Sequence, residues 1–140
     1  MDAVSAFILI VEDEPKLAAL LGDYLKAAGH ETAWIANGLE VIPAIRARAP
    51  DLVLLDLMLP GRDGLDICRE LRSFSELPVI IMTAYSDLDS AVSSFQGGAF
   101  EYLPKPFDVD QAVELIRRAI DESMHQNGAS EEEGLVPEIL

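Results

Sequence analysis

Short apolar runs alternate with amphipathic segments five times along this chain of 140 residues. Uninterrupted apolar runs such as residues 52–55 are typical of strands buried on both faces of a parallel sheet. Apolar residues spaced three and four apart, as in Val113, Ile116 and Ile120, predict helices with one buried face. Five strand–helix repeats therefore predict an α/β fold, a doubly wound five-stranded parallel sheet with helices on both faces.

The same pattern sets approximate boundaries for the elements. Strands are expected at residues 7–11, 31–35, 51–56, 79–82 and 99–103. Helices are expected at residues 15–28, 38–45, 65–72, 88–95 and 109–124. Gly29 ends the first helix, because glycine readily takes the left-handed conformation that follows a helix. Pro43 lacks a backbone donor, so we expect the second helix to kink there or to begin late.

The spacing also predicts the buried side of each helix. In the first helix the inward positions are expected to be Leu17, Leu20 or Leu21, Tyr24 and Ala28. In the fourth helix they are expected to be Leu88, Val92 and Phe95. Cys68, the single cysteine, falls on the third helix and is interpreted as a core thiol.

Composition and charge narrow the possible functions. A formal net charge of −15 disfavours binding to DNA or to anionic membranes by this segment. The apolar runs are shorter than the roughly 18 residues of a membrane helix, and the N-terminus lacks the features of a signal peptide. We therefore expect a cytoplasmic protein. Residues 1–125 fit one domain, and residues 126–140 are interpreted as an acidic flexible linker toward a missing effector domain.

Chemically active side chains follow four of the predicted strands. Carboxylates end the first and third strands, a hydroxyl ends the fourth, and an ammonium group follows the fifth: Glu12, Asp13, Glu14, Asp56, Thr83 and Lys105. Because the carboxyl ends of parallel strands meet at one edge of a sheet, we expect these groups to converge. Carboxylates without cysteine or histidine nearby predict a hard cation, and Mg²⁺ is the natural candidate.

Asp56 is the candidate nucleophile within this set. An aspartate carboxylate can attack phosphorus and form an acyl phosphate. Such a transfer depends mainly on positioning and on neutralising charge. The cation would bind one phosphoryl oxygen, the Lys105 ammonium another, and the Thr83 hydroxyl or nearby amides a third.

These motifs resemble the receiver domain of two-component response regulators over about residues 7–124. The matching segments are Val11-Glu12-Asp13-Glu14, Leu55-Asp56-Leu57-Met58-Leu59-Pro60-Gly61 with Asp63-Gly64, Met82-Thr83-Ala84, and Tyr102-Leu103-Pro104-Lys105-Pro106-Phe107. The resemblance implies a flavodoxin-like (βα)₅ sheet with strand order 2-1-3-4-5. It also implies a phosphoacceptor that assists its own phosphotransfer and dephosphorylation, rather than an enzyme in the usual sense.

The resemblance assigns the metal site and the phosphoacceptor. Asp56 would accept a phosphoryl group from a sensor histidine kinase. Asp13, Asp56 and the backbone carbonyl of Met58 would bind Mg²⁺, for which Mn²⁺ can substitute. Glu12, which stands where many relatives have Asp, would assist through a water molecule.

The resemblance assigns the switch residues too. Lys105 would pair with the phosphoryl group, Thr83 would follow it, and Tyr102 would follow Thr83 inward. The peptide bond before Pro106 is expected to be cis. Met58, Ala84 and Tyr85 are expected to control access of water to the phosphoryl group.

The two halves of the chain resemble different subfamilies. Residues 8–74 are similar to OmpR-type regulators, whereas residues 78–108 and 136–140 are similar to NtrC-type activators. One interpretation is a chimera joined near Leu77-Pro78, and ordinary divergence is the alternative. In receivers the first helix generally meets the kinase. The fourth helix, fifth strand and last helix usually carry output and dimer contacts, so a homodimer is expected on phosphorylation.

Three other functions are compatible with parts of the pattern. A Mg²⁺-dependent phosphohydrolase with an aspartyl nucleophile usually has a second Asp two positions later, where this chain has Met58. A flavin-binding electron carrier needs a phosphate loop after the first strand, and the acidic residues 12–14 would repel phosphate. A degenerate receiver that only binds proteins would not need the complete set of acids, Thr83 and Lys105.

Overall fold

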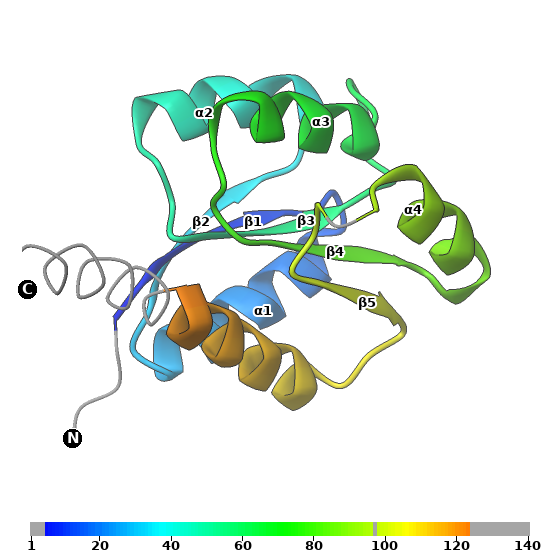
Figure 1. Ribbon diagram of the computed structural model, residues 1–140. Coiled ribbons are helices and arrows are strands. Elements are labelled where there is room, and N and C mark those ends of the chain that lie inside the picture. The colour runs from blue at the N-terminus through cyan, green and yellow to red at the C-terminus, as the bar shows by residue number, and fades with distance from the viewer. Residues whose placement is uncertain (1–4, 97, 124–140) are drawn as a thin grey trace, which may run out of the picture.

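Five parallel strands form one sheet in the order β2-β1-β3-β4-β5 (Figure 1). The computed structural model describes residues 5–96 and 98–123; predictions for Gly97 and for residues 124–140 lie outside this part of the chain. The strands are β1 (Phe7–Val11), β2 (Glu31–Ile35), β3 (Leu52–Asp56), β4 (Val79–Ala84) and β5 (Glu101–Lys105). The flavodoxin-like fold class and its strand order are therefore confirmed.

Helices cover both faces of the sheet (Figure 1). They are α1 (Pro15–Ala27), α2 (Val41–Ala47), α3 (Gly64–Phe74), α4 (Leu88–Ser94) and a last helix over residues 109–123, with the 3₁₀ turns η1 (Gly38–Glu40) and η2 (Tyr85–Asp87). The first and last helices pack on one face, and the other three pack on the opposite face. This arrangement gives the sheet a separate hydrophobic core on each side.

The central strand β3 shows why the sequence folds this way. All five of its residues are buried, with Leu52 and Leu54 facing one core and Val53 and Leu55 facing the other. Side chains alternate between the faces of a strand, so only a continuous apolar run can fill two cores. Asp56 is the one acid of this strand, and it lies at the carboxyl end.

Local signals at the helix ends agree with the expectations. Pro15 lies in the first turn of α1, and Gly29 has a φ of 97° just after the helix. Helix α2 begins late, at Val41, after the 3₁₀ turn. Pro43 therefore falls in the first turn, where its missing N–H leaves no helical hydrogen bond unmade.

Two predicted helix faces were partly wrong. In α1 the buried residues are Ala18, Leu21, Gly22 and Leu25, while Tyr24 is 43% exposed. In α4 Ala91 is buried and Val92 is 41% exposed, whereas Phe95, directly after the helix, is buried as expected. Small residues let a helix lie close to the sheet, so alanine and glycine take part in these faces beside large side chains such as Leu21 and Leu25.

The predicted strand boundaries also shift at the β5 edge. Strand β4 continues to Ala84, and β5 occupies residues 101–105 instead of 99–103. The register pairs Ile80 with Glu101 and Ala84 with Lys105. Apolar content favoured the earlier residues, but hydrogen bonding to β4 selects the later ones. Pro104 is tolerated because β5 is an edge strand.

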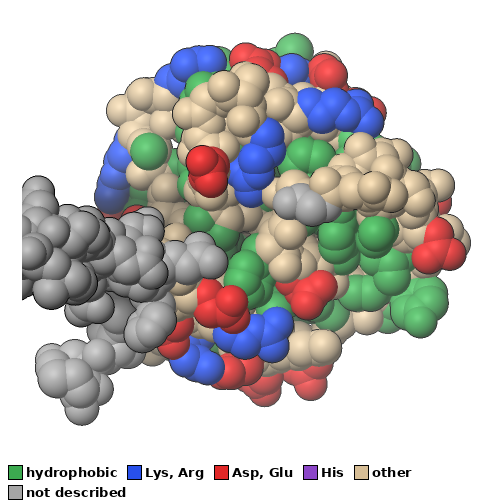
Figure 2. Space-filling model, viewed as in Figure 1, with side chains coloured by type: hydrophobic (Ala, Val, Ile, Leu, Met, Phe, Trp, Pro, Cys, Tyr) green, Lys and Arg blue, Asp and Glu red, His purple; other side chains and the backbone are tan. Residues whose placement is uncertain are grey.

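The surface carries both signs of charge. Figure 2 shows acidic and basic side chains interspersed on one face, with hydrophobic side chains gathered around the ends of β4 and β5. Among the described residues, no helix combines the length and the apolar character needed to cross a membrane.

Candidate functional site

The chemically active side chains converge at the carboxyl edge of the sheet. Strands β1, β3, β4 and β5 are consecutive neighbours and all run in the same direction. The residues at or just beyond their ends therefore face a common region: Glu12, Asp13, Asp56, Thr83 and Lys105. The convergence expected from the sequence is present in the structure.

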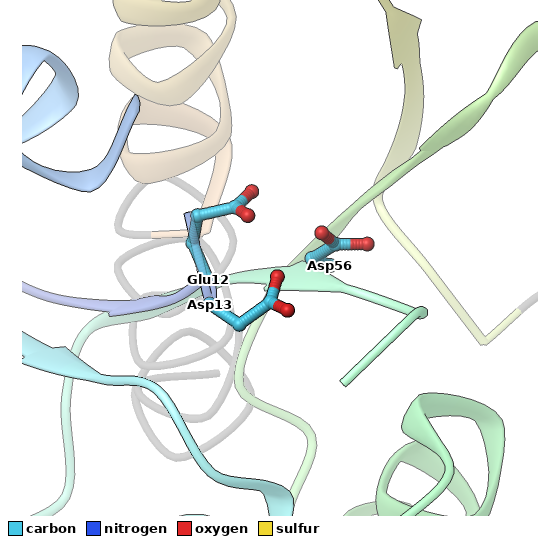
Figure 3. A group of neighbouring side chains, drawn as sticks. All are labelled: Glu12, Asp13 and Asp56. Carbon is cyan, nitrogen blue, oxygen red and sulfur yellow. The ribbon is translucent and has the colours of Figure 1, made fainter. Parts of the chain in front are cut away.

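Three carboxylates form the centre of this region. One oxygen each of Glu12, Asp13 and Asp56 lies within 4.8 Å of the others (Figure 3). Glu12 and Asp56 are buried, whereas Asp13 is exposed. At such a separation two charged carboxylates repel by roughly 3.5 kcal/mol at an effective dielectric near 20. A cluster of this kind needs a positive partner.

Lys105 supplies one positive charge from within the chain. Its Nζ lies 2.8 Å from Glu12 Oε1 and 2.8 Å from Asp56 Oδ2. Burial by itself lowers the pKa of Lys105, but the hydrogen bonds to Asp56 and Glu12 outweigh it and raise the pKa. Burial raises the pKa of Glu12, and Lys105 offsets part of this effect. One ammonium group is thus shared by two buried acids.

Backbone hydrogen bonds fix the turn that follows Asp56. The Met58 N–H donates to Asp56 Oδ1 at 3.0 Å, and the Leu57 N–H donates to the Met82 carbonyl at 3.2 Å. Both carboxylate oxygens of Asp56 therefore have donors. The side chains of Met58 and Tyr85 are 69% and 74% exposed.

Thr83 contributes the next strand end. Thr83 is 1% exposed, and its hydroxyl has no hydrogen-bond partner within the described part of the chain. Met82 lies opposite Asp56 in the β3–β4 register, and Thr83 is the next residue of β4. Thr83 is therefore close in the sheet to the candidate phosphoacceptor. A buried hydroxyl without a partner is unfavourable by about 1–3 kcal/mol, and a ligand oxygen would relieve this.

Tyr102 and Pro106 complete the predicted set. The Tyr102 hydroxyl donates to the Phe95 carbonyl at 3.0 Å, which links β5 to the end of α4. Burial raises the pKa of Tyr102. The Lys105–Pro106 peptide bond is cis, as the resemblance implied.

The donor set of the acidic cluster fits magnesium. Its ligand atoms are carboxylate oxygens from two neighbouring strand ends, and no thiol or imidazole takes part in this cluster. Mg²⁺ usually binds one or two carboxylates and completes its shell with water and phosphate oxygens. A surface hollow of about 520 Å³, lined by residues that include Arg72, Pro78 and Phe100, lies at the opposite edge of the sheet and contains none of these groups.

One residue that contacts the site was missed by the sequence reasoning. The Trp34 Nε1–H donates to the backbone carbonyl of Glu12 at 2.6 Å. Trp34 lies on the edge strand β2, in the segment Glu31-Thr32-Ala33-Trp34-Ile35, which gives no sign of contact with the acids. Only the parallel pairing of β2 with β1 brings the indole to this position.

Residues 8–117 match the response regulator receiver domain family, and the chain belongs to this family. It is a receiver domain of two-component response regulators. Receiver domains of response regulators interact with histidine kinases.

Several curated relatives are regulators of transcription by name. The chain is 45% identical over 120 residues to the DNA-binding transcriptional regulator NtrC of Escherichia coli, covering 85% of this chain and 26% of that protein. It is 41% identical over 133 residues to the transcriptional regulatory protein BaeR of Escherichia coli, covering 95% and 55%. It thus spans only a part of these relatives. Each of these two matches extends over most of the chain and therefore includes both halves. The chimera joined near Leu77-Pro78 stays a prediction, with ordinary divergence as the alternative.

Solved structures show the same fold. NtrX from Brucella abortus, in complex with ADP, superposes with a TM-score of 0.83 at 34% identity, covering 91% of this chain and 30% of that one. The BeF₃-activated receiver domain of RstA from Klebsiella pneumoniae gives a TM-score of 0.76 at 31% identity, covering 81% and 97%.

Proposed function

We propose that Asp56 accepts a phosphoryl group from a sensor histidine kinase and that this modification switches an output, which is transcription through a further domain. The arrangement around Asp56 carries the proposal. The carboxylate is 4% exposed, is 2.8 Å from the Lys105 ammonium, and shares a cluster with two other acids. Family membership supports the partner, and the relatives' names support the output.

Asp13, Asp56 and the Met58 carbonyl would hold Mg²⁺, with Glu12 assisting through a water molecule and Mn²⁺ able to substitute. The cation supplies charge neutralisation at a phosphoryl oxygen when it is bound. Asp13 is exposed beside two buried acids, so it is accessible to an ion arriving from solvent. The all-oxygen donor set supports this ligand assignment.

The chemical step uses the carboxylate of Asp56 as the nucleophile. One of its oxygens forms a bond to phosphorus while the bond from phosphorus to the histidine nitrogen breaks, and the nitrogen leaves with the electron pair. The product is an acyl phosphate on Asp56. Lys105 already contacts Asp56 Oδ2, so its ammonium is in place to neutralise the added negative charge.

The switch begins at the unpaired hydroxyl of Thr83. A phosphoryl group on Asp56 adds acceptor oxygens, and the Thr83 hydroxyl moves to donate to one of them. Tyr102 then gives up the Phe95 carbonyl and turns inward, which releases the end of α4. Moving such an equilibrium from about 1:99 to 99:1 requires roughly 5.5 kcal/mol of differential stabilisation.

Met58, Ala84 and Tyr85 are proposed to limit the access of water to the phosphoryl group. Met58 and Tyr85 are well exposed and follow the ends of β3 and β4, which flank the site. Met58→Asn and Tyr85→Ala should therefore change the rate of dephosphorylation. Unchanged rates in both variants would remove this part of the proposal.

The output is proposed to act through other parts of the protein. We infer a receiver domain over residues 1–125, followed by a linker over residues 126–140 toward an effector domain. The face formed by α4, β5 and the last helix would make a homodimer on phosphorylation. The net charge of −15 argues against direct contact of this segment with DNA.

Two alternatives are less well supported. A phosphohydrolase with an aspartyl nucleophile would place a second acid where Met58 lies, and no carboxylate takes that position. A receiver that only binds proteins would not need Thr83 and Lys105 together at the edge of the acidic cluster. Neither alternative accounts for all the groups at the site.

The decisive experiment is intact-mass analysis after incubation with Mg²⁺ and acetyl phosphate. The wild-type chain should gain the mass of one phosphoryl group, and Asp56→Asn should gain none. Asp63→Asn is a matched control, because Asp63 is an exposed cap of α3 outside the acidic cluster. Equal labelling of wild type and Asp56→Asn would refute the assignment.

A further inference from the structure

Trp34 is the only tryptophan of the chain, and the proposed function does not use it. It lies on the edge strand β2 and is 50% exposed. A half-exposed indole buries less apolar area than a core aromatic side chain, so it contributes less hydrophobic stabilisation. Its polar contact is therefore the more informative feature.

That contact is with the backbone of the acidic loop. The Trp34 Nε1–H lies 2.6 Å from the Glu12 carbonyl oxygen. The β1–β2 register ends with Val11 opposite Ile35, and the Glu12 N–H still donates to the Ile35 carbonyl at 3.1 Å. In a longer parallel ladder the Glu12 carbonyl would accept from a backbone N–H of β2. Here the indole takes the place of that donor.

Both backbone polar groups of Glu12 are consequently bound to β2. The same peptide unit leads into Asp13, whose carboxylate belongs to the acidic cluster. Among the described residues, the Asp13 side chain has no hydrogen bond or ion pair of its own. Its position relative to Asp56 thus depends on how firmly the backbone at Glu12 and Asp13 is held.

We propose that Trp34 is a positioning residue for the cation site: its indole N–H fixes the Glu12 carbonyl and so presents the Asp13 carboxylate in the geometry that binds Mg²⁺. This inference rests on the proposed function, because it assumes that Asp13 is a ligand. Preorganised ligands bind more tightly since less freedom is lost on binding.

The competing explanation is that Trp34 only covers the sheet edge. In that case loss of the N–H would leave cation binding unchanged, whereas loss of the ring would destabilise the fold. The two explanations separate if the N–H is removed and the ring is kept. Because the chain contains one tryptophan, biosynthetic replacement alters only this position.

The test compares two forms of the intact chain. In one, Trp34 is replaced by benzothienylalanine, which has sulfur in place of the N–H. In the matched control it is replaced by 5-fluorotryptophan, which keeps the N–H. Calorimetric titration with Mg²⁺ gives the dissociation constant, and urea unfolding in the presence of a chelator gives the stability of the metal-free fold.

We expect the benzothienyl form to bind Mg²⁺ about 3- to 10-fold more weakly than the wild type, the range set by one hydrogen bond. The fluorinated form should bind like the wild type. Equal affinity in all three forms would overturn the inference. A benzothienyl form that loses metal-free stability as strongly as it loses affinity would also overturn it, because the role would then be structural.

A second readout separates this inference from the proposed function. In ¹⁵N-labelled protein the single indole N–H signal should shift as Mg²⁺ is added, and Asp13→Asn should abolish the shift. If Asp13→Asn binds Mg²⁺ as tightly as the wild type, the metal assignment itself is wrong and the inference falls with it. If Asp13→Asn loses binding while the benzothienyl form keeps it, only the role of Trp34 is refuted.

Discussion

The ammonium group of Lys105 is shared by two buried acids, so its removal should lower the unfolding free energy by an amount that can be estimated. Glu12 and Asp56 are 0% and 4% exposed, and the Lys105 Nζ lies 2.8 Å from each. Lys105→Met keeps much of the side-chain volume but leaves both buried acids without their cation. Breaking a buried pair in this way typically costs about 3–5 kcal/mol of stability.

The cost has an upper limit because Glu12 can take up a proton. Protonating a glutamate with a reference pKa of 4.5 at pH 7.5 costs roughly 4 kcal/mol, at about 1.4 kcal/mol per pH unit. If the unpaired carboxylate of Glu12 destabilised the fold by more than this protonation cost, Glu12 would instead be protonated and neutral. We therefore expect Lys105→Met to lose about 3–4 kcal/mol of unfolding free energy at pH 7.5 without divalent ions.

Urea unfolding of four proteins measures this coupling: wild type, Lys105→Met, Glu12→Gln and the double variant. Glu12→Gln removes one buried charge, so Lys105→Met should cost at least about 1.5 kcal/mol less in that background. Added Mg²⁺ should restore more stability to Lys105→Met than to the wild type, since it replaces the missing charge. A loss below about 1 kcal/mol that is identical in both backgrounds would refute the reasoning.

Three further predictions concern other parts of the fold. Burial lowers the pKa of His30, whose Nδ1 accepts the Ala6 N–H at 3.2 Å, so stability should fall as the pH drops below 6.5. Thermal unfolding should show this extra slope in the wild type and not in His30→Gln. Gly38→Ala would place a Cβ 2.5 Å from the Arg62 carbonyl oxygen and should cost about 1–3 kcal/mol in urea unfolding, whereas Gly29→Asn, at a positive φ with open space, should cost less. Burial raises the pKa of Cys68 to about 12, so a thiol reagent should label it only on unfolding; rapid labelling of the native chain would contradict its burial.

The prediction of the site from the sequence used the topology of the sheet more than the properties of individual residues. The positions of Asp56 and Lys105 at strand ends followed from apolar runs and from the rule that parallel strands end at one edge. The shared ion pair did not follow, because it depends on side-chain rotamers across 49 residues of sequence separation. The unpaired Thr83 hydroxyl and the Tyr102–Phe95 hydrogen bond were likewise visible only in three dimensions.

The errors in the fold have a common physical cause. Periodicity located every helix, yet it could not decide between Tyr24 and Gly22 as the inward residue of α1. Hydrophobicity ranks the large side chain first, whereas in the fold Gly22 faces Ile10 and Thr32 of the sheet and Tyr24 is 43% exposed. The shift of β5 arose in the same way, because its register is set by β4 and not by its own composition.

The amino-acid sequence by itself determined the parallel sheet, the edge at which the candidate site lies, and the identity of the charged groups there. These features depend on local periodicity and on connection rules that act along the chain. The tertiary structure alone decided that Lys105 holds two acids at once and that the Trp34 indole reaches the Glu12 carbonyl. Such contacts join residues of separate strands, and their distances are fixed only when the whole sheet and its two cores are packed.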